Sequence, residues 1–132
     1  MTPVVIDASA GVELAADTRR GRALRGLLPS DAVPWVPDIF FAECGAVLRR
    51  WEINEVLSVD EVAAAVAQLV AWPLRIVQIR GLFHDAWRIR HNVTFADGLY
   101  VALADHLGAH LLTDDRRLAN APGLTVRTMT LP

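Results

Sequence analysis

Lysine is absent from this chain, because all 13 basic residues are arginine. The absence excludes three classes of phosphate-handling protein. A P-loop requires lysine before its serine or threonine. Response-regulator receivers and haloacid-dehalogenase-like phosphatases both use a lysine at the phosphoryl site. The phosphatases also need a second aspartate two residues after the first, where this chain has Ser9.

Cysteine is nearly as scarce, and long apolar runs are missing. Cys44 stands alone and cannot form an internal disulfide, which is typical of a reducing compartment. No stretch approaches the ~18 apolar residues of a membrane-spanning helix, and the N-terminus lacks the pattern of a signal peptide. We therefore expect a soluble, cytoplasmic protein with no membrane partner.

The histidines contain no compact pair with the spacing of zinc ligands. We therefore expect surface or packing positions for all four: His84, His91, His106 and His110.

The composition that is present predicts one domain, spanning residues 1–132, because single domains cluster near ~100–150 residues. The net charge of −2 argues against broad, charge-driven binding of nucleic acid, while a locally basic surface stays compatible with it. Apolar residues make up 53% of the chain and the mean hydropathy is +0.30, which is high for a small soluble monomer. Some apolar surface is therefore expected to need a partner. Trp51, Trp72 and Trp87 are expected in the core or at an interface.

Short strand-like segments alternate with helical ones along the chain. Strands are predicted near residues 2–8, 32–37, 74–79, 109–113 and 124–129, and helices near residues 9–17, 18–28, 39–54, 58–71, 81–92, 96–108 and 114–123. Ser58 and Glu61 have the spacing of a capping box, and Asp38 and Gly108 are placed to begin and end helices. This alternation predicts an α/β fold, a three-layer α/β/α sandwich with a central, mostly parallel sheet.

Aspartates stand at the ends of two predicted strands. Asp7 follows the first strand, and Asp114 and Asp115 follow the fourth. If these strands are neighbours, their carboxylates meet at the crevice outside the carboxyl ends of the strands, where parallel sheets bind ligands. Each aspartate alone is equally consistent with a turn residue or a helix cap.

Two further acids lie on predicted helices. Glu43 shares an apolar stripe with Ile39, Phe40, Ala46 and Val47, and a buried carboxylate is expensive unless it is paired or binds metal. The alternative for Glu43 is an ion pair with an arginine distant in sequence. Asp97 opens the most apolar helix, where an acid also complements the helix dipole.

Four carboxylates that converge would repel one another strongly. At an effective dielectric of ~20 and ~5 Å, each pair is unfavourable by roughly 3 kcal/mol. Such a cluster must take up protons or bind a cation. Oxygen ligands without histidine or thiolate suit Mg²⁺ or Mn²⁺. If the acids converge, the sequence therefore predicts a divalent metal site.

Four motifs in their order along the chain, "VIDAS", "FAE", "ADGLYVALA" and "LLTDDRRL", resemble the PIN-domain nucleases, and most closely the VapC-type toxins of bacterial toxin–antitoxin pairs. The resemblance covers essentially the whole chain. It implies a PIN-like fold and a toxin that hydrolyses RNA phosphodiester bonds with Mg²⁺ or Mn²⁺. It places the metal-binding and catalytic acids at Asp7, Glu43, Asp97 and Asp115, with auxiliary hydroxyls at Ser9 and Thr113.

The resemblance also implies that a cognate antitoxin protein neutralises the chain, and the apolar content favours a homodimer with a groove for an antitoxin peptide. Arg116 and Arg117 follow the last acid and are candidate RNA contacts. The basic run of Arg19, Arg20, Arg22 and Arg25 is either a further RNA contact or a solvated face.

Two details depart from the family pattern or leave a choice open. Gly98 replaces the alanine that usually follows Asp97, and Asp114 is an additional acid that competes with Asp115 for the ligand position. Ser9 is equally consistent with starting the first helix. The competing interpretation of the whole chain is a catalytically inactive PIN-like module that binds other proteins.

Overall fold

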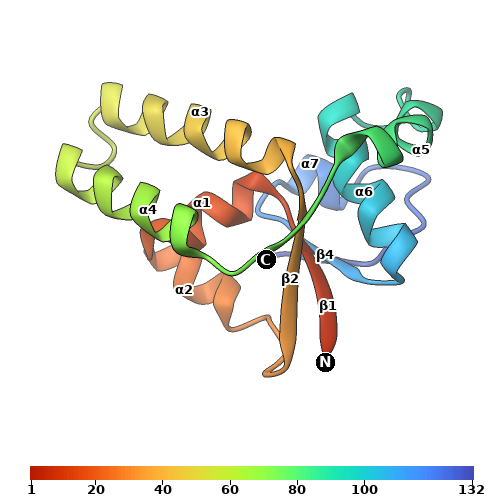
Figure 1. The fold of residues 1–132 in the computed structure, drawn as a ribbon, viewed down its shortest axis with the longest axis horizontal. Coiled ribbons are helices and arrows are strands. Elements are labelled where there is room, and N and C mark those ends of the chain that lie inside the picture. Colours follow the sequence, from red (N-terminus) through yellow and green to blue (C-terminus); the bar gives the residue numbers. More distant parts are fainter.

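The computed structural model describes residues 1–132 and contains one five-stranded sheet (Figure 1). Its strands are β1 (Thr2–Ile6), β2 (Ala32–Pro37), β3 (Arg75–Val77), β4 (His110–Leu112) and β5 (Thr128–Met129). They lie in the order β3-β2-β1-β4-β5, and every neighbouring pair is parallel. The first and fourth strands are neighbours, because Val5 pairs with Leu111 and Ile6 with Leu112, so the condition under which the acids at their ends would meet is fulfilled.

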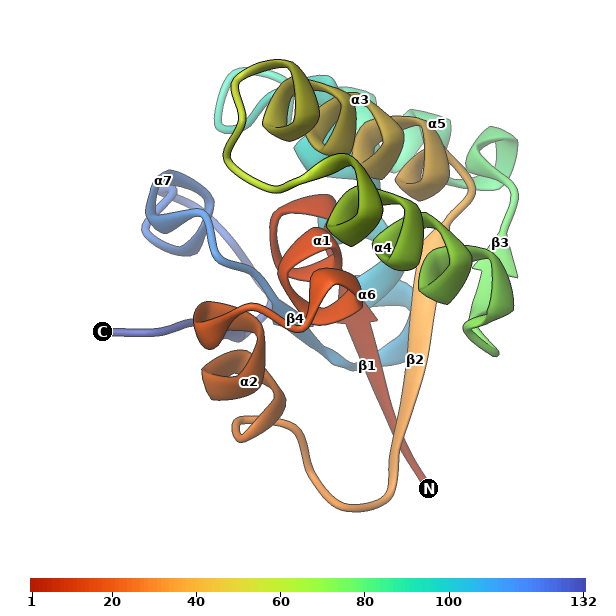
Figure 2. The ribbon, with the colours of Figure 1, turned by 90° about the vertical axis from the view of Figure 1, so that its left-hand side faces the viewer.

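Helices cover both faces of this sheet, so the predicted three-layer arrangement is confirmed (Figures 1 and 2). The α-helices are α1 (Ala8–Ala16), α2 (Arg19–Arg25), α3 (Ile39–Ile53), α4 (Val59–Ala71), α5 (Phe83–Arg88), α6 (Phe95–Leu107) and α7 (Arg116–Ala119), and a short 3₁₀ helix, η1, spans Ile79–Leu82. In Figure 2, α1, α2 and α4 lie in front of the strands and α6 lies behind them. α6 packs against β1, β2 and β4.

Strand order reverses at β1. From β1 the chain proceeds outward to β2 and β3, and then returns through α6 to β4 and β5 on the other side. Parallel sheets of this kind bind ligands at the carboxyl end of the strands where the order reverses. The topology therefore fixes the expected site at the ends of β1 and β4.

Local capping signals explain where several helices begin and end. Ser58 and Glu61 form both hydrogen bonds of the predicted capping box at the start of α4. Gly108 ends α6 in the left-handed conformation, which glycine adopts without steric cost. The expected cap at Asp38 is wrong in detail, because its carboxylate makes no capping bond and instead accepts from the backbone N–H of Ile79 at 3.3 Å.

The core is a single cluster of 28 buried residues between the sheet and its helices. Its centre is the apolar run of β1, whose Val4, Val5 and Ile6 are at most 1% exposed. α1 and α3 cross closely at Gly11, where a Cβ atom would collide with the ring of Phe40. Glycine at this position therefore sets how near α3 comes to the start of α1.

The tryptophans were predicted in the core or at an interface. Trp51 and Trp72 pack against the core, whereas Trp87 is 52% exposed and lies outside it, so an interface position for Trp87 stays a prediction. The buried row of α3 is Phe40, Cys44 and Leu48. No helix in the structure has the length and apolar character needed to cross a membrane.

Candidate active site

Asp7 lies at the carboxyl end of β1 and is only 3% exposed. It is the N-cap of α1, and its Oδ1 accepts from the backbone N–H of Ala10 at 3.0 Å. The alternatives of strand-end acid and helix cap are therefore both true of one residue. The prediction that α1 begins near Ser9 is off by one residue, because Ala8 is its first residue.

Two hydroxyls fix the carboxylate of Asp7. Ser9 Oγ donates to Oδ1 at 2.7 Å, and Thr113 Oγ1 donates to Oδ2 at 2.5 Å. Thr113 follows β4 and is fully buried, so this bond joins the ends of the two central strands. Ser9 and Thr113 thus lie where the sequence motifs predicted, and they hold both oxygens of Asp7 in place.

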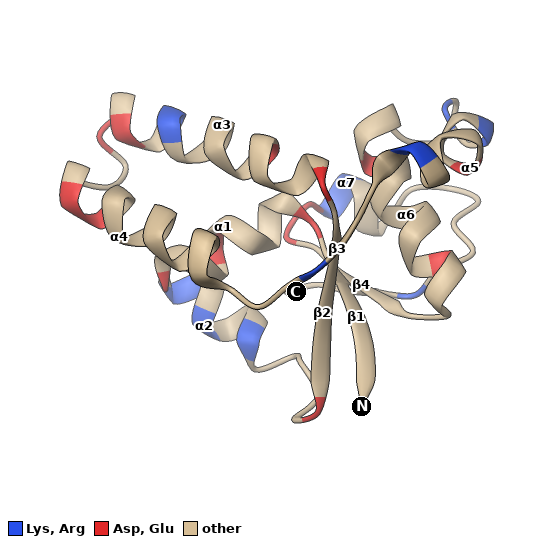
Figure 3. Cartoon of the chain, viewed as in Figure 1, with Lys and Arg blue, Asp and Glu red and all other residues tan.

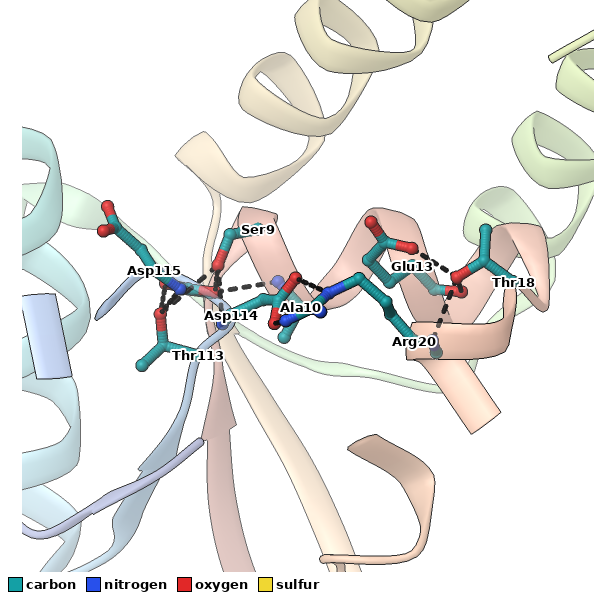
Figure 4. A network of polar contacts seen from close by, with 10 residues as sticks. Ser9, Ala10, Glu13, Thr18, Arg20, Thr113, Asp114 and Asp115 are labelled. Carbon is teal, nitrogen blue, oxygen red and sulfur yellow. Dashed lines mark hydrogen bonds and ion pairs between the residues drawn. The ribbon is translucent and has the colours of Figure 1, made fainter. Parts of the chain in front are cut away.

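Asp114 and Asp115 point in different directions from the end of β4 (Figure 4). Asp114 turns toward α2, where Arg20 donates to both of its oxygens at 2.9 and 2.6 Å. Asp115 caps α7 through one oxygen, which accepts from the backbone N–H of Arg117 at 2.9 Å. Asp114 is thus paired with Arg20, whereas Oδ1 of Asp115 lies 3.9 Å from Nε of Arg117 and its Oδ2 accepts no hydrogen bond. Asp115 is not among the residues that line the cavity described below.

Glu43 lies half-buried on α3, beside the buried row of that helix rather than within it. Its Oε1 accepts a hydrogen bond of 2.6 Å from the hydroxyl of Tyr100, which is 1% exposed on α6. The alternative of an ion pair with a distant arginine is wrong, because no arginine pairs with Glu43. One oxygen of Glu43 is therefore oriented by a buried phenol.

Asp97 lies in the first turn of α6, one helical turn before Tyr100 on the same helix face. Its backbone N–H donates to the hydroxyl of Thr94, the N-cap of the helix, at 3.2 Å. Gly98 does not disturb this turn. A Cβ there would lie 3.1 Å from the backbone oxygen of Ala86, so the glycine lets α5 pack closely against α6.

Asp7, Glu43 and Asp97 line one cavity of about 270 Å³ at the carboxyl end of the sheet. Ser9 and Tyr100 also contribute to its walls. Arg50, one of the lining residues, makes no ion pair with any of the three acids. A larger cavity of about 560 Å³ lies elsewhere, between α1, α2 and the end of α4, and contains none of these acids.

The acids around the smaller cavity influence one another electrostatically. Burial raises the pKa of Asp7 to about 6, against its hydrogen bonds from Thr113, Ser9 and Ala10, and the charge of Asp97 raises it further. Burial and then the charge of Asp97 raise the pKa of Glu43, although the Tyr100 hydrogen bond lowers it. Burial and the charge of Asp115 raise the pKa of Asp97. All three carboxylates are therefore harder to ionise than free carboxylates.

Carboxylates that resist ionisation together are the kind of site that a cation stabilises. The donor set is made only of carboxylate and hydroxyl oxygens, which suits Mg²⁺ or Mn²⁺ rather than zinc. As the side chains stand, no three acidic, histidine or cysteine groups lie close enough to form a ready metal cluster. The chemistry of these residues fits a divalent cation, and convergence within one coordination sphere requires their side chains to move.

Other residues singled out in the sequence lie outside the cavity. Arg116 and Arg117 are exposed on α7, beyond Asp115. In the basic run on α2, Arg20 pairs with Asp114, and Arg22 and Arg25 lie near Asp17, so these guanidinium groups are partly neutralised. All four histidines are exposed. Cys44 is buried, and burial raises the pKa of its thiol to about 12, so it is not a nucleophile.

Sequence reasoning missed the role of Tyr100 and the pairing of Arg20 with Asp114. Tyr100 was part of a quoted motif, and its position three residues after Asp97 was the available signal for a shared helix face. The Arg20–Asp114 pair joins residues 94 apart, and nothing in their local sequence indicates the contact.

Comparison with known proteins identifies the same family that the sequence motifs resemble. The PIN domain model matches residues 4–124. The chain is 42% identical over 129 residues, 94% of each chain, to the protein named ribonuclease VapC1 of Mycobacterium tuberculosis.

Solved structures share the fold at lower identity. The structure of VapC20 of Mycobacterium tuberculosis, described as a toxin that cleaves the sarcin–ricin loop, aligns with a TM-score of 0.64 at 19% identity, covering 87% of this chain and 92% of that one. A toxin–antitoxin complex from Klebsiella pneumoniae aligns with a TM-score of 0.59 at 14% identity, covering 98% and 96%. By its sequence and its fold, this chain belongs to the PIN domain family.

Proposed function

We propose that this chain is a ribonuclease toxin that hydrolyses RNA phosphodiester bonds with Mg²⁺ or Mn²⁺ and is neutralised by a cognate antitoxin. The whole chain, residues 1–132, would act as one nuclease domain. The identity to a protein named ribonuclease VapC1 over 94% of the chain supports the activity. The observation that carries the proposal is the cavity at the strand ends, which three carboxylates line without an arginine partner.

A bound divalent cation would lower the pKa of a water molecule and offset the charge of the phosphate in the transition state. Asp7, Asp97, Glu43 and Asp115 are the residues that we propose to hold it. Asp7 is the most rigid of these ligands, because Ser9, Thr113 and Ala10 fix its oxygens. A carboxylate that is already held in place loses less conformational entropy when it binds a cation.

Glu43 and Asp115 each keep one carboxylate oxygen without a hydrogen bond to the protein. Tyr100 holds Oε1 of Glu43, so Oε2 is the atom available for the cation or for accepting a proton from an attacking water. Asp115 has the same arrangement at the start of α7. We prefer Asp115 over Asp114 as the ligand, since Arg20 occupies both oxygens of Asp114.

An antitoxin partner is supported by the fold shared with a toxin–antitoxin complex from Klebsiella pneumoniae. The cavity of about 560 Å³ offers a place for an antitoxin segment, because apolar residues of β1, α1 and α4 line it beside Arg25. We expect Ala71→Trp, which fills this cavity, to weaken neutralisation by the co-expressed antitoxin without reducing RNA cleavage. Unchanged neutralisation would place the antitoxin elsewhere.

A homodimer is proposed from the apolar side chains that α3, α4 and their connection leave exposed: Ile53, Val56, Val59, Val66 and Val70. Exposed apolar side chains that lie together on neighbouring helices are typical of a protein–protein interface. Light scattering on the purified chain measures the mass directly. A monomer at all concentrations would contradict this part of the proposal.

The activity is tested by incubating the purified chain with mixed RNAs in Mg²⁺, in Mn²⁺ and in chelator. We expect cleavage that requires a metal and disappears in Asp7→Asn and Asp97→Asn, because an amide keeps the shape of the side chain but not its charge. Asp60→Asn, at an exposed position on α4, is the matched control and should cleave like the wild type.

Equal cleavage by wild type and both active-site variants would indicate a contaminating nuclease. No cleavage by any preparation, with every variant folded, would favour the inactive PIN-like binding module. The assay therefore distinguishes the two interpretations of the family resemblance.

A further inference from the structure

Aromatic side chains are exposed on α5, the helix that packs against α6. Phe83 is 48% exposed and Trp87 is 52% exposed. Both rings contact Phe95 in the first turn of α6, at centroid distances of 4.7 Å and 6.3 Å. Phe95 is partly buried, so it supports the two outer rings from below. Because about half of each ring is exposed, core packing does not account for these two large aromatic side chains, and such exposed patches mark binding sites.

Arginines accompany these rings. The guanidinium of Arg90 lies 4.7 Å from the centre of the Trp87 ring, and its Nη1 donates to the backbone oxygen of Trp87 at 2.9 Å. Arg80, on η1, is exposed, and neither Arg80 nor Arg90 pairs with a carboxylate. The one acid of α5, Asp85, is already engaged by Arg88 and His106. This surface, made of Phe83, Trp87, Arg80 and Arg90 and called here the aromatic–arginine surface, therefore carries uncompensated positive charge.

The aromatic–arginine surface rests on the helical turn that carries Asp97, because Phe83 and Trp87 contact Phe95 in the first turn of α6. Ala86, next to Trp87 in sequence, packs against Gly98, which is next to Asp97. In Figure 1, α5 lies at the end of the molecule toward which β1 runs, which is also the end where α3 begins. Figure 3 shows basic residues around α5 at this same end. A chain that crosses the cavity can therefore continue over α5.

We propose that the aromatic–arginine surface binds single-stranded RNA, with one or two unstacked bases lying on Trp87, Phe83 and the Arg90 guanidinium. The inference rests on the proposed ribonuclease function and adds that the substrate is single-stranded where it is held. Aromatic rings and guanidinium planes are the groups on which proteins stack splayed bases. Arg80 and Arg90 would contact the neighbouring phosphates.

The charges favour RNA over a second copy of the chain. A two-fold interface centred on this surface would bring the unpaired Arg80 and Arg90 of both copies together, which is unfavourable. The chain as a whole is acidic, with a net charge of −2, so an RNA site must be a local concentration of basic groups. Single-stranded RNA can stack its exposed bases on the rings and place its phosphates beside the arginines.

The test measures binding without cleavage. A short fluorescent single-stranded RNA of mixed sequence is titrated with the full chain in chelator, and the same RNA annealed to its complement is the second probe. We expect Trp87→Ala to weaken single-strand binding about tenfold, the range that loss of one stacked base produces. Trp87→Phe should retain most of the affinity, whereas Trp87→Leu should lose it, because leucine is apolar but cannot stack.

Charge is tested separately from stacking. Arg80→Gln should reduce the slope of log affinity against log salt by about 0.7, the value for one phosphate contact on a single strand. Arg49→Gln, at an exposed and unpaired position on α3, is the charge-matched control and should leave the affinity and the salt slope unchanged. The duplex should bind more weakly than the single strand, since its bases are already stacked.

Three results would overturn the proposal: equal affinity of Trp87→Ala and wild type, full affinity of Trp87→Leu, or equal binding of single strand and duplex. Full RNA affinity together with a halved mass for Trp87→Ala would assign the surface to a second copy instead. Cleavage assays run in parallel separate this proposal from the function on which it rests. Normal metal-dependent cleavage with an unchanged KM in Trp87→Ala refutes only the surface, whereas no cleavage by the wild type refutes the function.

Discussion

Replacing Asp7 with asparagine should stabilise the metal-free protein at neutral pH while removing its activity. Burial raises the pKa of Asp7 from 3.8 to about 6, so ionised Asp7 is unfavourable in the folded state. Each pKa unit corresponds to about 1.4 kcal/mol, and the rise therefore corresponds to about 3 kcal/mol. The asparagine side chain of the variant would not carry this cost, because the amide does not ionise.

The sign of the pH dependence follows from the direction of the pKa change. The unfolded chain releases the Asp7 proton near pH 3.8, whereas the folded chain keeps it until about pH 6. Below both values the cost is absent. It grows as the pH rises between them and is fully present above pH 6. At pH 5 about half of it has developed, so the advantage of Asp7→Asn should grow by about 1.5 kcal/mol between pH 5 and pH 7.5.

Urea unfolding followed by tryptophan fluorescence, in chelator at both pH values, measures this difference. Comparing two pH values removes any constant effect of the amide on its hydrogen bonds with Ser9, Thr113 and Ala10. Asp60→Asn, at an exposed position, controls for the general effect of losing one negative charge. If the stability difference between Asp7→Asn and wild type is the same at both pH values, the claim that the site resists ionisation is refuted.

Three further predictions concern the groups around the site. Tyr100→Phe should lower kcat for RNA cleavage about tenfold or more, which corresponds to the free energy of a hydrogen bond to a charged group. The same change should have little further effect on kcat in a Glu43→Gln background. Equal losses in both backgrounds would contradict a role of Tyr100 through Glu43. Arg20→Gln and Asp114→Asn, combined in a double-mutant cycle for unfolding, should show a coupling of about 1 kcal/mol, and zero coupling would contradict the pairing. Gly98→Ala should change the free energy of unfolding by less than about 1 kcal/mol, because the gain in helix propensity offsets a small shift of α5; a loss above about 2 kcal/mol in urea unfolding would show that α5 cannot move.

The sequence predicted the elements of the fold well because their signals are local. The apolar run of β1, the capping box at Ser58 and Glu61, and Gly108 at the end of α6 each specify their own structure. The adjacency of β1 and β4 entered only as a condition: if the two strands are neighbours, the acids at their ends meet, and the structure fulfils that condition. The resemblance to the PIN-domain nucleases, rather than any local pattern, grouped Asp7, Glu43 and Asp97, and all three line one cavity.

The environment of each acid was less predictable. Apolar residues on several faces of α3 obscured which row is buried, and Glu43 proved to lie beside the row of Phe40, Cys44 and Leu48. Tyr100 resembled an ordinary core aromatic, since its hydroxyl partner lies on a different helix. The exposure of Trp87 depends on how far α5 extends past the core, which no local pattern specifies.

The separation of Asp114 from Asp115 was decided by tertiary structure. The two residues are adjacent and chemically identical, so sequence alone left both as candidate ligands. Their distinction comes from α2, which brings Arg20 to Asp114, and from α7, whose N-terminus Asp115 caps. Long-range packing thus determines which of two equivalent carboxylates remains available.

The central claim is that Asp7 at the end of β1, Glu43 on α3 and Asp97 in the first turn of α6 form one site for a divalent cation. Titration of the purified chain with Mn²⁺ in a calorimeter tests this claim most directly. We expect the wild type and Asp60→Asn to bind Mn²⁺ alike, and Asp97→Asn to bind it at least about tenfold more weakly, because that variant lacks one of the anionic ligands. Equal Mn²⁺ affinity in Asp97→Asn and wild type, or no binding by a folded wild type, would contradict the account.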